Sequence, residues 1–138
     1  MTAYLTDNYH GYQLRACEEF WNLTAVEIKK LAHGCGPGSG IWEKFVPDNV
    51  LGVDLTPACD IHDVECYFAD TKEELAAAAS NFLYNMLLIN DVISRFWLMR
   101  IIRRSIIMNL YYTAIVDVGN PVMWWAKVKR FFNSSYQG

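Results

Sequence analysis

The chain has few charged side chains, and its longest run without charge is too short to cross a membrane. Only 20% of the 138 residues are charged, whereas 53% are hydrophobic. The longest uncharged run covers residues 75–90, which include a serine and three asparagines, whereas a transmembrane helix needs about 20 predominantly apolar residues. The N-terminus lacks a basic region followed by an apolar stretch, so we expect no signal peptide.

The sequence also lacks internal repeats, low-complexity tracts and obvious linkers. Residues 1–138 are therefore expected to form a single domain, which at this length can bury a hydrophobic core without disulfide or metal staples. The net charge is −3 and no recognition motif is seen. We therefore expect no nucleic-acid partner.

Charge is distributed unevenly along the chain. Residues 1–74 hold 5 basic and 13 acidic side chains, a net charge of −8, whereas residues 75–138 hold 7 and 2, a net charge of +5. The basic half also contains Trp97, Trp124 and Trp125. Tryptophan beside basic residues favours the surface of an anionic bilayer, and the alternative is that these aromatics fill the core. We expect the protein to bind a bilayer surface peripherally. We expect it either in the cytoplasm or exported by a non-classical route.

The pattern of caps and apolar residues predicts an all-α domain. Capping boxes at Thr24–Glu27 and Thr71–Glu74 open two helices, which are expected to end near Gly34 and Ser94. Thr-Pro at positions 56 and 57 starts another helix, and a glycine-rich loop precedes it. The expected helices cover residues 24–33, 56–69, 71–94, 103–118 and 122–132. The second and third, joined by a short turn, are expected to form an antiparallel core pair.

Two adjacent polar residues, His62 and Asp63, lie on the helix expected over residues 56–69. Neighbouring helical side chains point about 100° apart, so the two residues must serve different purposes. A histidine can act as a general base, and a carboxylate is a ligand for a hard cation. The sequence therefore predicts a base and a cation ligand side by side, just after the glycine-rich loop.

Two motifs in this region resemble those of the phospholipase A2 superfamily, particularly its small bacterial and phage members. Residues 34–40 read Gly-Cys-Gly-Pro-Gly-Ser-Gly and are similar to the family's calcium loop, Gly-Cys-x-x-Gly-x-Gly. Residues 59–63 read Cys-Asp-Ile-His-Asp and are similar to its helical motif, Cys-x-x-His-Asp. The resemblance is strong over residues 33–67 and weaker towards the C-terminus.

The resemblance implies a calcium-dependent hydrolase of the sn-2 ester of glycerophospholipids. Asp63 and the backbone carbonyls of Gly36, Gly38 and Gly40 would bind Ca²⁺, which prefers oxygen ligands. The bound ion would polarise the ester carbonyl, and the amide of Gly38 would donate to the oxyanion. His62 would remove a proton from the attacking water.

One departure from the family bears directly on activity. Family enzymes pair the histidine with an aspartate on the next helix. In the bacterial pattern, a phenylalanine stands three residues after this aspartate, and a methionine stands four residues after the phenylalanine. Phe82 and Met86 match that frame, so the aspartate is expected at position 79, where this chain has alanine. Three explanations stay open. The natural protein has lost catalysis, His62 uses another partner, or alanine was introduced at position 79 to silence the enzyme. The competing function is therefore a catalytically inactive module that binds a membrane or a protein.

The cysteines allow two interpretations. The resemblance implies a disulfide between Cys35 and Cys59, although Cys66 and Tyr67 each stand one place away from the family's cysteine and tyrosine. The alternative is a Cys3His zinc site made by Cys35, Cys59, His62 and Cys66. Its three helical ligands would span about 10 Å at 1.5 Å per residue, too far to converge on one ion with bonds near 2 Å.

Overall fold

The computed structural model describes residues 3–32, 49–112, 121–122 and 124–129. It has mixed α and β structure, so the predicted all-α class is wrong. Strands β1 (Tyr4–Tyr9) and β2 (Tyr12–Cys17) form an antiparallel hairpin, and β3 (Asn49–Val50) pairs with β4 (Val53–Asp54) in a second, smaller one.

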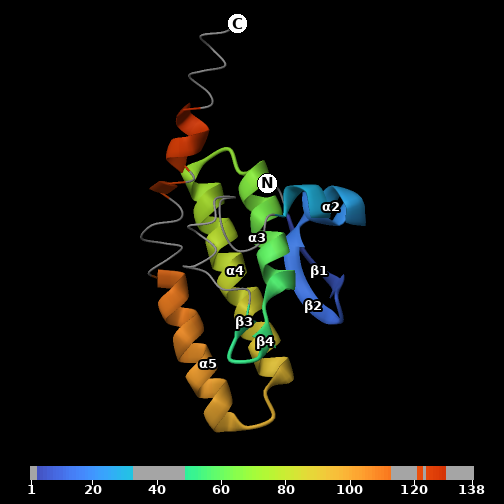
Figure 1. Ribbon diagram of the computed structural model, residues 1–138. Helices are drawn as coiled ribbons and strands as arrows, with labels where there is room; N and C mark the ends of the chain where they lie inside the picture. The colour runs from blue at the N-terminus through green and yellow to red at the C-terminus, as the bar shows by residue number, and fades with distance from the viewer. Residues whose placement is uncertain (1–2, 33–48, 113–120, 123, 130–138) are drawn as a thin grey trace, which may run out of the picture.

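The first hairpin turns at His10 and Gly11, both with positive φ (52° and 89°). This backbone geometry matches the twist of the flanking strands. The side chains of β2 alternate, with Leu14 and Ala16 buried, whereas β1 is mostly exposed. The hairpin therefore presents one apolar face to the helices, and it lies beside α3 in Figure 1.

Two long helices form the centre of the molecule. Helix α3 covers Thr56–Phe68 and helix α4 covers Lys72–Ile93, close to the predicted bounds. The Thr71 side chain caps α4 by accepting a hydrogen bond from the Glu74 amide (3.1 Å). The short turn between the helices makes them antiparallel neighbours, as Figure 1 shows.

The remaining helices flank this pair. Helices α1 (Glu18–Trp21) and α2 (Ala25–Leu31) follow the hairpin, and α2 has the predicted capping box. Helix α5 (Trp97–Leu110) begins six residues before the predicted start and lies against α4. Residues 121–122 and 124–129 are helical, and the rest of the predicted last helix lies outside the described residues. None of the described helices is long and apolar enough to cross a membrane.

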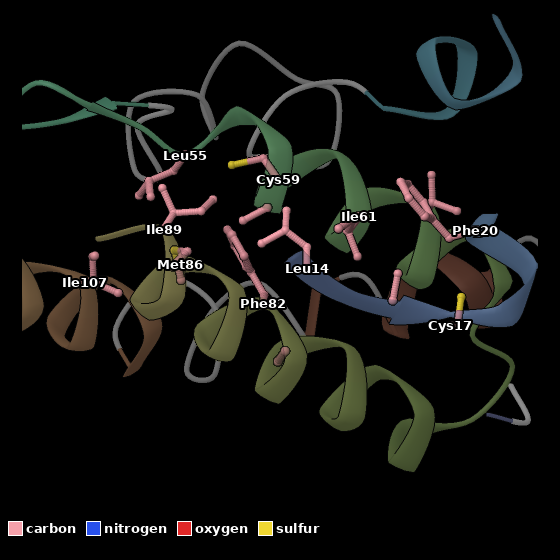
Figure 2. Close-up of a cluster of buried hydrophobic side chains, with 14 of the residues drawn as sticks. Leu14, Cys17, Phe20, Leu55, Cys59, Ile61, Phe82, Met86, Ile89 and Ile107 are labelled. Carbon is pink, nitrogen blue, oxygen red and sulfur yellow. The ribbon is translucent and has the colours of Figure 1, made fainter. Parts of the chain in front are cut away.

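The core lies where β2, α3, α4 and α5 meet. Figure 2 shows side chains from these elements pointing towards one another. Its fully buried large members include Leu14, Phe20, Leu55, Ile61, Phe82, Met86, Ile89 and Ile107. This core fixes the register of α3 against α4, which positions the candidate site.

Candidate functional site between α3 and α4

His62 lies in the interface between α3 and α4 with only 6% of its surface exposed. Its ring stacks on the ring of Phe82 from α4, with centroids 4.4 Å apart and planes 20° apart. Burial lowers the pKa of the imidazole from the usual 6.5 to about 4. His62 is therefore neutral near pH 7.

Cys66 is the polar neighbour of His62 on the same helix face. Its Sγ atom lies 3.4 Å from His62 Nε2, as the four-residue spacing allows. Burial, followed by the negative charge of Asp63, raises the pKa of the Cys66 thiol far above its usual range. The donor and acceptor in this contact depend on the tautomer: in the Nδ1–H form, Nε2 accepts the hydrogen of the protonated thiol.

Ala79 is buried on α4, one helical turn before Phe82. Its neighbour Ala78 packs in a small cluster with Cys66. Ala79 therefore lies one turn along α4 from the ring that stacks on His62. A methyl group there cannot accept a hydrogen bond from the imidazole ring. Among the described groups, burial is the sole resolved cause of the His62 pKa shift.

Asp63 is half-buried on α3, rotated about 100° from His62. Its carboxylate suits a hard cation, but Ca²⁺ takes six to eight oxygen ligands. The other expected ligands, Gly36, Gly38 and Gly40, lie outside the described residues, as does the predicted oxyanion amide of Gly38. Within the described ranges, no group of three or more His, Cys, Asp or Glu side chains could hold a metal ion. The calcium site stays a prediction.

The described cysteines divide into two kinds. Cys59 is disulfide-bonded, which removes its sulfur from the alternative zinc site. Cys17 and Cys66 are free and buried. Cys35 lies outside the described residues, so its pairing with Cys59 stays a prediction.

A buried polar network beside His62 was not predicted from the sequence. The carboxyl group of Glu65, on α3, is fully buried and accepts a hydrogen bond from Asn81 Nδ2 on α4. Asn81 Oδ1 accepts from Arg15 Nε (2.7 Å), and the amide of Asn85 exchanges two hydrogen bonds with the Arg15 backbone (2.7 and 2.9 Å). The network ties β2 to both central helices.

Burial dominates the electrostatics of Glu65. It raises the pKa of the carboxyl from 4.5 to about 8, against the lowering effects of the hydrogen bond from Asn81 and the nearby Arg15 charge. One oxygen of Glu65, Oε2, has no hydrogen-bond partner among the described residues. Glu65 is therefore mostly protonated at neutral pH. Two asparagines four residues apart on an apolar helix, Asn81 and Asn85, were the signal for this network in the sequence.

Comparisons with known proteins add no relative. No protein-family model matches the chain, and neither a curated protein nor a solved structure matches it. The arrangement around His62 and the two sequence motifs are therefore the basis for assigning a function.

Proposed function

We propose that the chain is a phospholipase A2-like, calcium-dependent hydrolase of the sn-2 ester of glycerophospholipids, impaired by the alanine at position 79. The observation that carries the proposal is the placement of His62, whose buried ring stacks on Phe82 of α4, one helical turn after Ala79. In this proposal, an aspartate at position 79 would pair with the ring. The two sequence motifs supply the expected cation ligands, Asp63 and backbone carbonyls of the glycine-rich loop.

His62 is the base in this proposal. Nε2 is occupied by Cys66, so Nδ1 must take the proton from the attacking water. For that, the ring proton must sit on Nε2, which requires an acceptor on the α4 side. The alanine methyl group is no acceptor, and the Cys66 thiol donates instead. The tautomer that could act as base is therefore disfavoured, which supports low activity.

Asp63 would hold Ca²⁺ together with backbone carbonyls of Gly36, Gly38 and Gly40. When bound, the ion supplies Lewis-acid polarisation of the ester carbonyl and neutralises the lipid phosphate. The chain itself would fix the position of the base relative to the cation ligand, because His62 and Asp63 are adjacent on α3. The expected products are a lysophospholipid and a fatty acid.

The second candidate is a binding module without turnover, acting on a membrane or a protein partner. The neutral, buried imidazole, whose pKa shift has burial as its one resolved cause among the described groups, favours it. A lost orienting aspartate costs a serine protease about four orders of magnitude in rate. A loss of that size would leave a lipid-binding protein in practice.

The proposal is tested with vesicles whose lipids carry a labelled fatty acid at either sn-1 or sn-2. We expect slow release of the sn-2 label only, dependent on calcium, abolished by a chelator and by His62→Ala. Release that is unchanged by the chelator, or unchanged in His62→Ala, would refute the assignment. No release above background, with calcium binding retained, would support the binding module.

A further inference from the structure

The corner between α4 and α5 carries several exposed large apolar side chains that are close together in the sequence. We call it the corner surface; its members are Val92, Ile93, Phe96, Trp97, Leu98, Ile101 and Ile102. Phe96 and Trp97 are 73% and 67% exposed. In Figure 1 this corner is the end of the molecule where α4 turns into α5, away from the β1–β2 hairpin. An exposed patch of this kind marks an interaction site.

The corner surface is locally basic. Residues 92–116 contain four arginines and neither aspartate nor glutamate, in a chain whose net charge is −3. Arg95, Arg100 and Arg104 are exposed among the apolar side chains. Asp91, at the edge of this stretch, is the nearest acidic residue in the sequence. The surface is therefore both apolar and locally basic.

Hydrogen bonds hold the corner in its conformation. Asn90 Nδ2 donates to the backbone oxygen of Arg100 (3.0 Å), which joins the end of α4 to α5. The half-buried Arg103 donates to Ser94 Oγ (3.1 Å) and twice to the backbone oxygen of Leu51 (3.1 and 3.2 Å). These bonds fix the turn, so docking requires little further ordering of the backbone.

A groove between α4 and α5 continues from the corner surface. Its volume is about 440 Å³, and it is lined by Tyr84, Leu87, Leu88, Asp91, Val92 and Arg104. Val92 belongs to both the groove and the corner surface. The groove is mostly apolar, and its charged lining residues are Asp91 and Arg104. Its apolar part has the chemistry of a site for an acyl chain.

We infer that the corner surface is the face on which this protein docks to an anionic lipid bilayer. Aromatic and aliphatic side chains would enter the interface while Arg95, Arg100 and Arg104 meet the lipid phosphates. A second copy of the chain fits this face less well, because a two-fold contact would set basic patches against each other. The inference rests on the proposed function for taking lipid as the partner, but docking needs neither calcium nor turnover.

The test measures cosedimentation of the full chain with vesicles in the presence of a chelator. Vesicles of phosphatidylcholine alone are compared with vesicles that also contain phosphatidylglycerol. The matched variants are Val92→Asp and Val26→Asp, since both valines are 65% exposed but Val26 lies on α2. A third variant, Phe96→Asp, changes the most exposed side chain of the surface.

We expect binding to the anionic vesicles, a several-fold loss in Val92→Asp and Phe96→Asp, and unchanged binding in Val26→Asp. Replacing Arg100 and Arg104 by glutamine should remove the preference for anionic lipid. Equal losses in both valine variants, or no preference for anionic lipid, would overturn the inference. So would a dimer in sedimentation velocity that Val92→Asp dissociates, because the face would then join two copies. Loss of catalysis alone leaves these readouts unchanged.

Discussion

The Nε2 atom of His62 lies 3.4 Å from the Sγ atom of Cys66, one turn further along α3. The thiol stays protonated because burial raises its pKa, so it can donate to Nε2 when the ring is in its Nδ1–H form. In the proposed function, a carboxylate at position 79 would engage the same nitrogen. The state of one ring proton therefore connects the local structure with the proposed chemistry.

The contact predicts the tautomer of His62. In this chain, ¹⁵N chemical shifts of the imidazole should show the Nδ1–H form near pH 7, because Nε2 accepts from Cys66. In Ala79→Asp they should show the Nε2–H form, because the carboxylate accepts from the ring. Cys66→Ala, which removes the thiol donor, should leave a mixture. A dominant Nε2–H form in the unchanged chain would contradict this interpretation.

Acid should destabilise the fold through His62. Its pKa is lowered from 6.5 to about 4 in the folded protein, so below pH 6.5 the unfolded state binds the proton more readily. The stabilisation is fully present above pH 6.5 and is lost as pH falls towards 4. The full loss is on the order of 3 kcal/mol, at 1.36 kcal/mol per pKa unit. Urea unfolding at a series of pH values measures it.

His62→Gln is the control for this acid effect, because glutamine does not titrate. The difference in unfolding free energy between the chain and His62→Gln should shrink as pH falls below 6.5. A difference that stays constant down to pH 4 would show that the imidazole is not held neutral by burial. Comparing the two proteins cancels the titration of all other groups.

Glu65 should act in the opposite direction. Its pKa is raised from 4.5 to about 8 by burial, so the folded protein keeps a proton that the unfolded chain releases. The stabilisation is fully present below pH 4.5 and is lost as pH rises to 8, a change on the order of 5 kcal/mol. Glu65→Gln keeps an acceptor for Asn81 but does not titrate. Its unfolding free energy, measured with urea, should therefore fall much less between pH 4.5 and pH 8. An identical pH profile in the variant would contradict the protonated state of Glu65.

Calcium affinity should depend on Asp63. Asp63→Asn removes one charged oxygen ligand, so calorimetric titration should show binding weakened by about tenfold or more. Asp60→Asn is the matched control, because Asp60 lies on the same helix and accepts a hydrogen bond from the Tyr9 hydroxyl (2.9 Å). Equal weakening in both variants would indicate a general charge effect. Absence of calcium binding in the unchanged chain would refute the cation site.

The central helices could be predicted from the sequence because their end signals are local. Thr-Pro at positions 56 and 57 and the cap at Thr71 depend only on neighbouring residues. The β1–β2 hairpin was missed because β1 exposes most of its side chains and so has no alternating pattern. Its turn is His-Gly rather than the familiar Asn-Gly. The start of α5 was missed because Trp97–Ile102 is apolar on the exposed side as well.

The helical placement of His62 and Asp63 was also predictable, because their motif lies within one helix, whereas their function stays a prediction. The alanine at position 79 departs only from the pattern of the family that the chain resembles. The contact between Glu65 and Asn81 depends on how α3 and α4 register against each other. Packing of the core decides that register, and no local pattern records it.

The most direct test of the proposed function is calcium-dependent fatty-acid release by Ala79→Asp, compared with Ala79→Asn. The two side chains have nearly the same size, and only the aspartate carries a charge that can orient and stabilise the imidazole. We expect a gain of up to about four orders of magnitude for Ala79→Asp, which is lost when His62→Ala is added, and no such gain for Ala79→Asn. Two folded, calcium-binding variants that both stay inert would contradict it and leave the chain as a binding module.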